Sequence, residues 1–384
     1  MSSPSGSTVP FGIYLHVPFC ASRCGYCDFN TYTSADLGGG GSRAEYPTVA
    51  ATEIRYAAAT VGRRSVDTVF VGGGTPTLLS PAELGGLLAV ISEEFGLAPN
   101  AEVTTEANPE SVDAAALAAL RAAGFTRISF GMQSAASHVL AVLDRQHTPG
   151  RALQCVQWAR EAGFAHINLD LIYGTPGESE ADWKDSLHAA VQAGPDHISA
   201  YSLILEEGTR LAARVRRGEL PAPDPDALAD RYELAEAVLT DAGFAWYEVS
   251  NWAREESARA RHNLLYWTGG DWWGIGPGAH SHLAGRRWWN VRHPRDYAQR
   301  VADGSPAADH EDLTSAQQQL ERVMLTLRLR EGLGLEELSD VGRAASTRAV
   351  SDGLLEPDAH TTGRAVLTLR GRLLADAVIR DLTD

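Results

Sequence analysis

The sequence predicts an α/β fold in which a partial, parallel barrel of six βα units precedes a smaller α+β C-terminal domain. Two observations predict it. Apolar runs typical of buried strands alternate with alanine-rich helical stretches, and a pattern of helix end, glycine and strand recurs along the chain. The 384 residues are enough for a barrel and an appendage, and a hydrophobic content of 44% is enough to fill their cores.

The barrel is expected over residues 11–250. Its strands are predicted near residues 11–16, 67–71, 102–106, 127–132, 166–172 and 197–204. Gly124, Gly163 and Gly243 each stand between a helical stretch and an apolar run, and Gly194 does so in a looser copy. Glycine accepts the left-handed conformation that ends a helix, so each copy is expected to be one αβ unit of a parallel sheet.

Two further segments follow the barrel. Residues 251–313 hold six of the nine tryptophans together with His262, His280 and His282, and are expected to connect the domains through an aromatic surface or pocket. Residues 314–384 predict a helix, a short acidic helical turn and a strand running into a helix, a pattern similar to a winged-helix module. Because this module has no basic recognition helix, we expect it to act as a lid or docking element.

The chain is acidic, with a formal net charge of −16. Phosphate contacts need clustered lysine and arginine, so this balance argues against nucleic acid as a partner. Residues 1–10 carry neither the basic nor the apolar stretch of a signal peptide, and are expected to be disordered. No later apolar run is long enough to span a bilayer, which predicts a cytoplasmic protein without a transmembrane segment.

Three cysteines, Cys20, Cys24 and Cys27, lie directly after the first predicted strand. A [4Fe–4S] cluster normally takes four thiolates, so three in eight residues leave one iron open to another ligand. A disulfide framework needs an even count, and Cys155, in a helical stretch far along the chain, is expected to be a packing residue. A zinc site with His16 as fourth ligand remains a minor alternative.

Polar and glycine residues gather at the ends of the later strands. Gly72-Gly73-Gly74-Thr75 follows the second strand, and three glycines let a ligand lie against the backbone. The remaining candidates are taken to be strand-end residues: Glu106, Gln133, Arg145 and Asp170. An arginine can clasp a carboxylate, and carboxylates can accept from hydroxyl or ammonium groups, so together they predict a polar ligand site.

The CxxxCxxC spacing, with Tyr26 before the last cysteine, resembles the radical S-adenosylmethionine (SAM) superfamily. The whole chain is similar to its coproporphyrinogen dehydrogenase-like branch. The resemblance implies a partial (β/α)6 radical SAM barrel, a [4Fe–4S] cluster on the three cysteines, and SAM chelating the open iron. The positions that match SAM contacts of the branch are Tyr14, Tyr26, Gly73, Gly74, Thr75, Glu106, Gln133, Arg145 and Asp170.

Two features distinguish the chain within that branch. Phe29 stands where the dehydrogenase has a further cysteine, and only ten residues precede the first strand. The sequence HNxxYW, from His262 to Trp267, resembles the signature of the HemW group of haem chaperones. This resemblance implies haem as cargo and an unidentified haem-acceptor protein as partner, with a homodimer left open.

Histidine is a common haem ligand, which makes His262 the leading axial candidate, with His280 and His282 as competitors. The enzyme alternative is an oxygen-independent coproporphyrinogen III dehydrogenase, which Phe29 and the HNxxYW sequence argue against. A third class, radical SAM modification of tRNA or peptide, shares the cysteine motif but does not predict HNxxYW.

Overall fold

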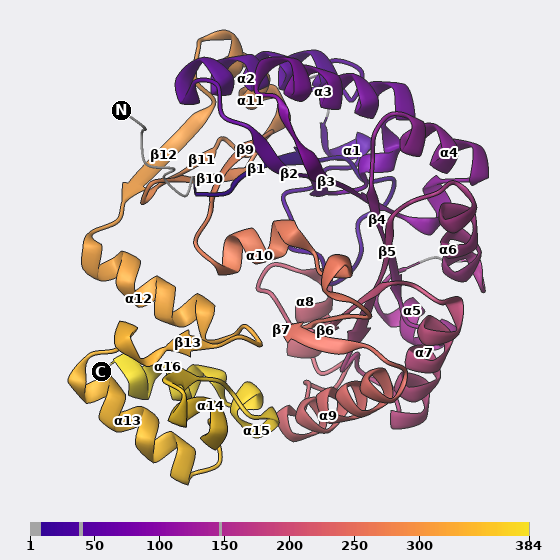
Figure 1. Ribbon diagram of the computed structural model, residues 1–384. Coiled ribbons are helices and arrows are strands. Elements are labelled where there is room, and N and C mark those ends of the chain that lie inside the picture. The colour runs from indigo at the N-terminus through magenta and orange to yellow at the C-terminus, as the bar shows by residue number, and fades with distance from the viewer. Residues whose placement is uncertain (1–8, 38–40, 146–147, 384) are drawn as a thin grey trace, which may run out of the picture.

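The computed structural model describes residues 9–37, 41–145 and 148–383. Residues 1–8, which make up most of the expected disordered N-terminus, lie outside the described residues. Among the described residues, twelve strands form one sheet in the order β12-β11-β10-β9-β1-β2-β3-β4-β5-β6-β8-β7. The sheet curves, with helices on its outer side, the helix at residues 261–267 on its inner side, and the C-terminal helices near the end of the curve (Figure 1). The predicted α/β class, with a parallel barrel and a C-terminal domain, is confirmed.

The six predicted parallel strands form the barrel. They are β1 (Phe11–Val17), β2 (Val66–Gly73), β3 (Leu97–Ala107), β4 (Arg127–Gln133), β5 (His166–Tyr173) and β6 (His197–Ser202). The helices of this part are α1 (Ser34–Leu37), α2 (Tyr46–Val61), α3 (Pro81–Glu94), α4 (Ala114–Ala122), α5 (Ser137–Val142), α6 (Arg151–Glu161), α7 (Glu180–Ala193), α8 (Arg210–Arg216) and α9 (Pro225–Asp241). Short 3-10 turns occupy Pro76–Leu78 and Pro109–Ser111. Because helices cover the parallel strands, their residues are almost continuously apolar and buried, as in Phe11–Val17.

The segment 251–313 does more than connect two domains, because it extends the sheet at both edges. On one edge, β8 (Asn251–Ala253) pairs with β6 and with β7 (Ala245–Glu248). On the other edge, β9 (Asp271–Ile275) pairs with β1 and leads into β10 (His280–Leu283), β11 (Arg286–Asn290) and β12 (Ala307–Asp312). Between the two groups lie a 3-10 turn (Glu256–Ala258) and α10 (Arg261–Trp267), and α11 (Pro294–Ala302) precedes β12.

The prediction that the Gly243 copy is a unit of the parallel sheet is wrong in one respect. Its strand, β7, forms the sheet edge and pairs with β8 in the antiparallel sense. Only two residues separate β7 from β8. A parallel pair needs a crossover of a dozen or more residues, so a connection this short permits only the antiparallel arrangement.

The C-terminal part has its own small core, which includes Leu327, Leu355 and Ile379. It comprises α12 (Ser315–Thr326), β13 (Leu333–Gly334), a 3-10 turn (Leu335–Glu337), α13 (Asp340–Ser351), α14 (Pro357–Thr361), β14 (Arg364–Ala365), α15 (Leu369–Leu373) and α16 (Ala375–Thr383). β13 and β14 pair in the antiparallel sense, so helices accompany a small two-stranded sheet. That this part is a winged-helix-like module stays a prediction.

A buried ion pair ties the barrel to the segment that contains the HNxxYW sequence. Arg127 on β4 donates to Glu102 on β3 at 3.0 Å, and the two side chains are only 2% and 5% exposed. Arg127 also donates to the carbonyl oxygens of Ala258 and Arg259, and Glu102 accepts from the backbone N–H of His262. The pair therefore fixes where α10 begins.

Removing the acid of this pair should be costly. We expect Glu102→Ala to lower the free energy of unfolding by about 3–5 kcal/mol, because it leaves the Arg127 charge buried without its partner. Glu94→Ala is the matched control, since it breaks the exposed Arg55–Glu94 pair and should cost no more than about 1 kcal/mol. Urea unfolding of both variants measures the difference. Equal costs would contradict the role given to Glu102.

Candidate functional site

The three cysteines lie on a loop whose two ends are held together by backbone hydrogen bonds. The loop leaves β1, and Cys20 and Tyr32 close it through two backbone hydrogen bonds, Cys20 N–H to Tyr32 O at 3.0 Å and Tyr32 N–H to Pro18 O at 2.7 Å. The side chain of Asn30 donates to the Pro277 carbonyl at 2.9 Å, which ties the loop to the segment after β9. The cysteines are free thiols, each partly buried.

The glycines after β2 allow this loop to lie against the sheet. A Cβ atom at Gly73, whose φ is +108°, would lie 2.6 Å from the ring of His16, and one at Gly74 would lie 2.5 Å from the Phe19 carbonyl oxygen. Gly74 N–H and Thr75 N–H donate to the carbonyls of Val17 and Phe19. Close backbone packing explains the glycine run, and it brings the Thr75 hydroxyl within 3.9 Å of the Cys20 sulfur.

The cysteine loop covers a cavity of about 400 Å³, which we call the cysteine pocket. Its lining includes every predicted cluster and SAM residue except Tyr14, namely Cys20, Cys24, Tyr26, Cys27, Gly73, Gly74, Thr75, Glu106, Gln133, Arg145 and Asp170. The residues come from the carboxyl ends of β1 to β5 and from the following loops. Parallel strands present these ends at one edge of the barrel, which is why distant residues meet here.

Arg145 lines this pocket from an element that the sequence did not predict. It follows α5 instead of ending a strand, so its assignment as a strand-end residue is wrong. Its guanidinium donates to the Cys24 sulfur at 3.3 Å and to the Gly131 carbonyl at 3.2 Å. A Cβ atom at Gly131 would lie 2.6 Å from the guanidinium and 2.7 Å from the Gln133 amide, so glycine leaves room for both.

Asp170 and Gln133 are both held in defined positions. Asp170 accepts from the Ser129 hydroxyl through Oδ2 and from the Asn168 amide through Oδ1, each at 2.7 Å. These two bonds fix the orientation of the carboxylate. Gln133 ends β4 with φ at +66°, a left-handed conformation that costs energy for any residue with a Cβ. The backbone therefore turns at Gln133 and places its side chain in the lining of the pocket.

Burial dominates the electrostatics of the pocket. It raises the pKa of Glu106 to about 8, with the neighbouring Asp170 carboxyl adding to the rise and the Gly73 N–H and Arg145 opposing it. Burial also raises the pKa of the Cys27 thiol to about 11 and raises the pKa of Cys20. A thiolate in this pocket would therefore need a positive partner, such as an iron ion.

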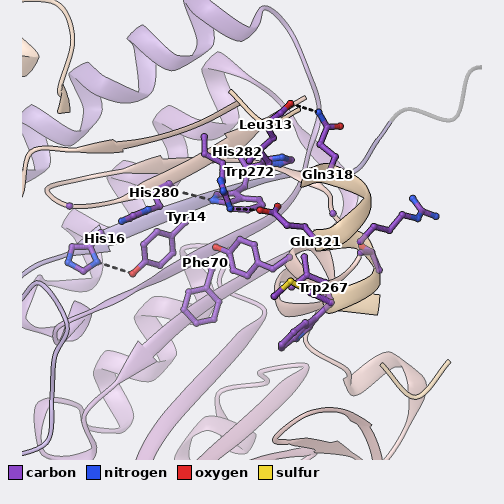
Figure 2. A pocket seen from close by; sticks show the side chains of 18 of the residues that line it. Tyr14, His16, Phe70, Trp267, Trp272, His280, His282, Leu313, Gln318 and Glu321 are labelled. Atoms are coloured by element: carbon purple, nitrogen blue, oxygen red, sulfur yellow. Dashed lines mark hydrogen bonds and ion pairs between the residues drawn. The ribbon is translucent and has the colours of Figure 1, made fainter. Parts of the chain in front are cut away.

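A second and larger cavity of about 1050 Å³ lies beside the first, and we call it the aromatic cavity. Figure 2 shows its lining, with Glu321 projecting from α12 toward the strands and Gln318 of the same helix donating to the Leu313 carbonyl. The aromatic, histidine and charged side chains of its lining include Tyr14, Phe29, Phe70, Tyr266, Trp267, Trp272, His280, His282, Arg287, Arg292 and Glu321. Phe29, Gly73 and Glu106 line both cavities, so the two spaces adjoin.

The tryptophans of residues 251–313 do not all belong to this cavity. Side chains alternate between the two faces of a strand, so Trp272 faces the cavity while Trp273 packs on the other face against Trp288, at a ring distance of 4.8 Å. Trp252 is fully buried beside α9, where its indole donates to Glu236. The expected aromatic pocket therefore exists, but Trp267 and Trp272 are the members of the cluster that line it.

The structure does not bring His262 to the cavity lining. Its side chain is 1% exposed, and both ring nitrogens are engaged, Nδ1 with the Thr68 hydroxyl and Nε2 with the Tyr266 hydroxyl, each at 2.8 Å. Burial lowers its pKa to about 3. Asn263 and Trp267 of the same motif hydrogen-bond to the buried Glu248, so most of the motif fixes α10 in place.

Tyr14 and His16 also differ from their expected places. Tyr14 lies in the aromatic cavity, outside the cysteine pocket. His16 donates from Nε2 to the Asn30 carbonyl at 2.9 Å, so its Nδ1 accepts from the Tyr14 hydroxyl at 2.9 Å. With both ring nitrogens occupied, His16 is not placed as the fourth ligand of a zinc site. Cys155 is fully buried in α6, as expected of a packing residue.

Several lining residues were missed by the sequence analysis. Asn108 and Tyr201 line the cysteine pocket, and the strand-end rule that selected Glu106 and Asp170 applies equally to them. Arg292 and Glu321 line the aromatic cavity from a loop and from α12, where no local pattern distinguishes them from surface residues. Arg292 follows β11 of the sheet extension, and the ion pair between Glu321 and Arg287 joins α12 to the same extension.

Comparisons with known proteins agree with this geometry. The sequence model of the radical SAM superfamily matches residues 14–190. Over 374 residues, the chain is 56% identical to the haem chaperone HemW of Mycobacterium tuberculosis, an alignment that covers 97% of this chain and 95% of that protein. The chain belongs to the HemW family of the radical SAM superfamily. The HemW of Bacillus subtilis is 33% identical, with coverage of 95% of this chain and 97% of that one.

HemW family membership is accompanied by a close structural likeness to an enzyme. The solved structure of coproporphyrinogen III oxidase (HemN) from Escherichia coli, a radical SAM enzyme, superposes with a TM-score of 0.84 at 25% identity, covering 98% of this chain and 90% of that one. The family implies a [4Fe–4S] cluster and SAM. Within the described part of the chain, no helix is long and apolar enough to cross a membrane.

The raised pKa of Glu106 has a measurable consequence for this HemW family member. A carboxyl whose pKa rises from 4.5 to about 8 on folding stabilises the fold at low pH, and this contribution is lost as the pH rises through 8. Glu106→Gln cannot ionise, so we expect it to gain on the order of 2–3 kcal/mol over the wild type between pH 5 and pH 9, less than the full shift because the side chain is partly exposed. Urea unfolding of the cluster-free chain at both pH values measures this gain. An equal change in the free energy of unfolding of the wild type and of Glu106→Gln between the two pH values would contradict the assigned pKa.

Proposed function

We propose that this protein is a haem chaperone, which holds haem in the aromatic cavity and passes it to an acceptor protein. We further propose that Cys20, Cys24 and Cys27 carry a [4Fe–4S] cluster and that SAM occupies the cysteine pocket. The names of the relatives from Mycobacterium tuberculosis and Bacillus subtilis support the first proposal. The superfamily and the chemistry of the lining residues support the second.

The observation that carries the proposal is the aromatic cavity itself. Its volume of about 1050 Å³ is at the upper end of ligand sites, as a large planar macrocycle requires. Tyr14, Phe70 and Trp272 supply flat apolar walls, while His280 and His282 supply imidazoles of the kind that ligate haem iron. Burial and the nearby guanidinium groups of Arg292 and Arg287 lower the pKa of His280, which favours the neutral ring that metal binding requires.

Haem also carries two propionate groups, which need cations. Arg287 already pairs with Glu311 and Glu321, each at 2.8 Å. Arg292 lines the same cavity, and among the described residues its guanidinium forms no ion pair. We therefore assign Arg292 as the cation for a propionate.

In the cysteine pocket, the residues match the polar groups of SAM. Arg145 offers a guanidinium for the carboxylate, while Asp170 and Glu106 offer acceptors for hydroxyl and ammonium groups. When bound, the cluster would supply an iron with an open coordination position. The protein's part is to hold SAM beside that iron and away from bulk water.

Phe29 bears on the choice between chaperone and dehydrogenase. Its side chain is 55% exposed and lies in the lining of both cavities, at the position where the dehydrogenase resemblance calls for a cysteine. A phenyl ring adds apolar surface at this junction but cannot donate hydrogen or ligate iron as a thiol can. This substitution favours storage of an apolar cargo over oxidative decarboxylation.

The cluster assignment predicts a clear division among the four cysteines. After anaerobic reconstitution, the wild type should hold about four irons per chain. Single Cys→Ala variants at 20, 24 and 27 should lose the cluster, whereas Cys155→Ala should retain it, because Cys155 packs inside α6. Iron and sulfide analysis of each variant is the measurement. Loss of iron in Cys155→Ala alone would overturn the assignment.

The chaperone proposal predicts binding without turnover. Titration with ferric haem should give roughly one haem per chain, and incubation with coproporphyrinogen III, SAM and a reductant should give no protoporphyrinogen IX. Arg292→Ala should weaken haem binding about twofold to fivefold, since an exposed ion pair contributes little. Arg286→Ala, on the same sheet extension but outside the aromatic cavity, is the control. Steady conversion of coproporphyrinogen III would instead establish the dehydrogenase.

A further inference from the structure

Two histidines of β10 face the aromatic cavity from the middle of a three-stranded meander. His282 pairs with Trp272 of β9 on one side and with Arg287 of β11 on the other. His280 lies two residues earlier on the same strand and therefore on the same face. Strand residues of this kind are held more rigidly than loop residues, which suits a metal ligand.

The hydrogen bond made by His282 fixes its tautomer. Nδ1 lies 3.1 Å from the carbonyl oxygen of Gly270, and a carbonyl can only accept, so Nδ1 carries the proton. The neutral ring then has its lone pair on Nε2, for which the structure shows no hydrogen bond among the described residues. The Asp271 carboxylate, 3.9 Å from Nδ1, adds negative charge behind the ring. A backbone carbonyl behind one ring nitrogen is the usual support of a metal-binding histidine.

Trp272 locks the orientation of the His282 ring. Its indole packs against the imidazole at a ring distance of 5.0 Å, and its Nε1–H donates to the His280 carbonyl at 3.0 Å. Behind Trp272 stands Tyr266, at a ring distance of 4.6 Å, and behind Tyr266 stands His262 at 4.8 Å. The buried histidine of the HNxxYW sequence thus supports His282, whose side chain is 14% exposed, through two aromatic rings. Figure 2 shows Trp272 and His282 side by side in the cavity.

His280 is less suited to bind iron. Its ring stacks on Trp289 at 5.7 Å and 25°, and among the described residues no hydrogen bond fixes which ring nitrogen is protonated. Two side chains that are about 7 Å apart on one strand approach a planar macrocycle from the same side, so only one of them can take an axial position. The geometry selects the histidine with the fixed tautomer.

We infer that His282 binds the haem iron through Nε2, and that His262 is a positioning residue that acts through Tyr266 and Trp272. This inference rests on the proposed haem-chaperone function and specifies its ligand. It explains why the motif histidine is buried with both nitrogens engaged while the ligand lies 20 residues later. It assigns to Gly270, whose carbonyl fixes the tautomer, a backbone role that no side-chain motif reveals.

Ferric haem titration of the reconstituted wild type and of histidine variants tests the inference. His282→Gln keeps an N–H donor for the Gly270 carbonyl but lacks a nitrogen with a free lone pair, so it separates ligation from structural support. It should lower haem affinity at least about tenfold and replace the wild-type Soret band and electron paramagnetic resonance signal with those of a haem without that histidine. His280→Gln tests the competing histidine and should keep a histidine-ligated spectrum. His310→Gln, on β12 and outside the aromatic cavity, is the control and should match the wild type.

Rescue by imidazole sharpens the test. Added imidazole should restore the histidine-ligated spectrum in His282→Gly, because it can occupy the vacated space and bind iron. His262→Gln should bind haem more weakly but keep a histidine-ligated spectrum, and imidazole should not restore its affinity. An unchanged spectrum in His282→Gln, or loss of the histidine signature in His262→Gln with rescue by imidazole, would overturn the inference. Absence of haem binding by the wild type would overturn the proposed function itself.

Discussion

The pairing of β1 with parallel strands on both sides is the constraint on which both cavities depend. Ile13 lies in register with Val69 of β2 and with Trp273 of β9, so one strand joins the barrel to the sheet extension. The carboxyl end of β1 leads into the cysteine loop, while the strands beyond β9 form a wall of the aromatic cavity. The approach is so close that a Cβ atom at Gly276 would lie 2.4 Å from the His16 carbonyl oxygen. Any shift of β9 would therefore disturb both sites at once.

This shared strand makes the two cavities one continuous region with two chemical characters. On the cysteine side, Arg145, Asp170 and Glu106 offer charge and hydrogen bonds in a small space. On the other side, rings dominate a space more than twice as large. Glu106 and Phe29 line both spaces, so a ligand in one space would lie beside residues that also line the other. A cluster held by the three cysteines and a cargo held in the aromatic cavity would therefore be neighbours.

The sequence predicted the features that follow from local patterns, such as motifs and strand ends. It did not predict the features that depend on which distant strands pair. The cysteine spacing and the strand-end rule predicted the lining of the cysteine pocket, because parallel strands must end at one edge. The strand-end rule failed for Arg145, which follows α5. Tyr14, which only the family resemblance indicated, lines the other cavity. Nor could periodicity show that residues 251–313 extend both sheet edges, since alternation within a strand does not say which strand lies beside it. Trp272 and Trp273 lie on opposite faces of β9, and only the pairing of β9 with β1 decides which of them faces the cavity.

The histidine of the HNxxYW sequence illustrates why a residue of a motif need not line the cavity beside it. A buried histidine with two hydrogen-bonded nitrogens and a pKa near 3 stays neutral at physiological pH, so it acts as a rigid spacer and not as a titrating group. Asn263 and Trp267 fix the same helix to Glu248 in the barrel edge, and the Glu102–Arg127 pair fixes its start. With α10 held at these points, Tyr266 packs against Trp272, and Trp272 packs against His282 in the lining of the aromatic cavity. The motif thus contributes to the packing that orients His282.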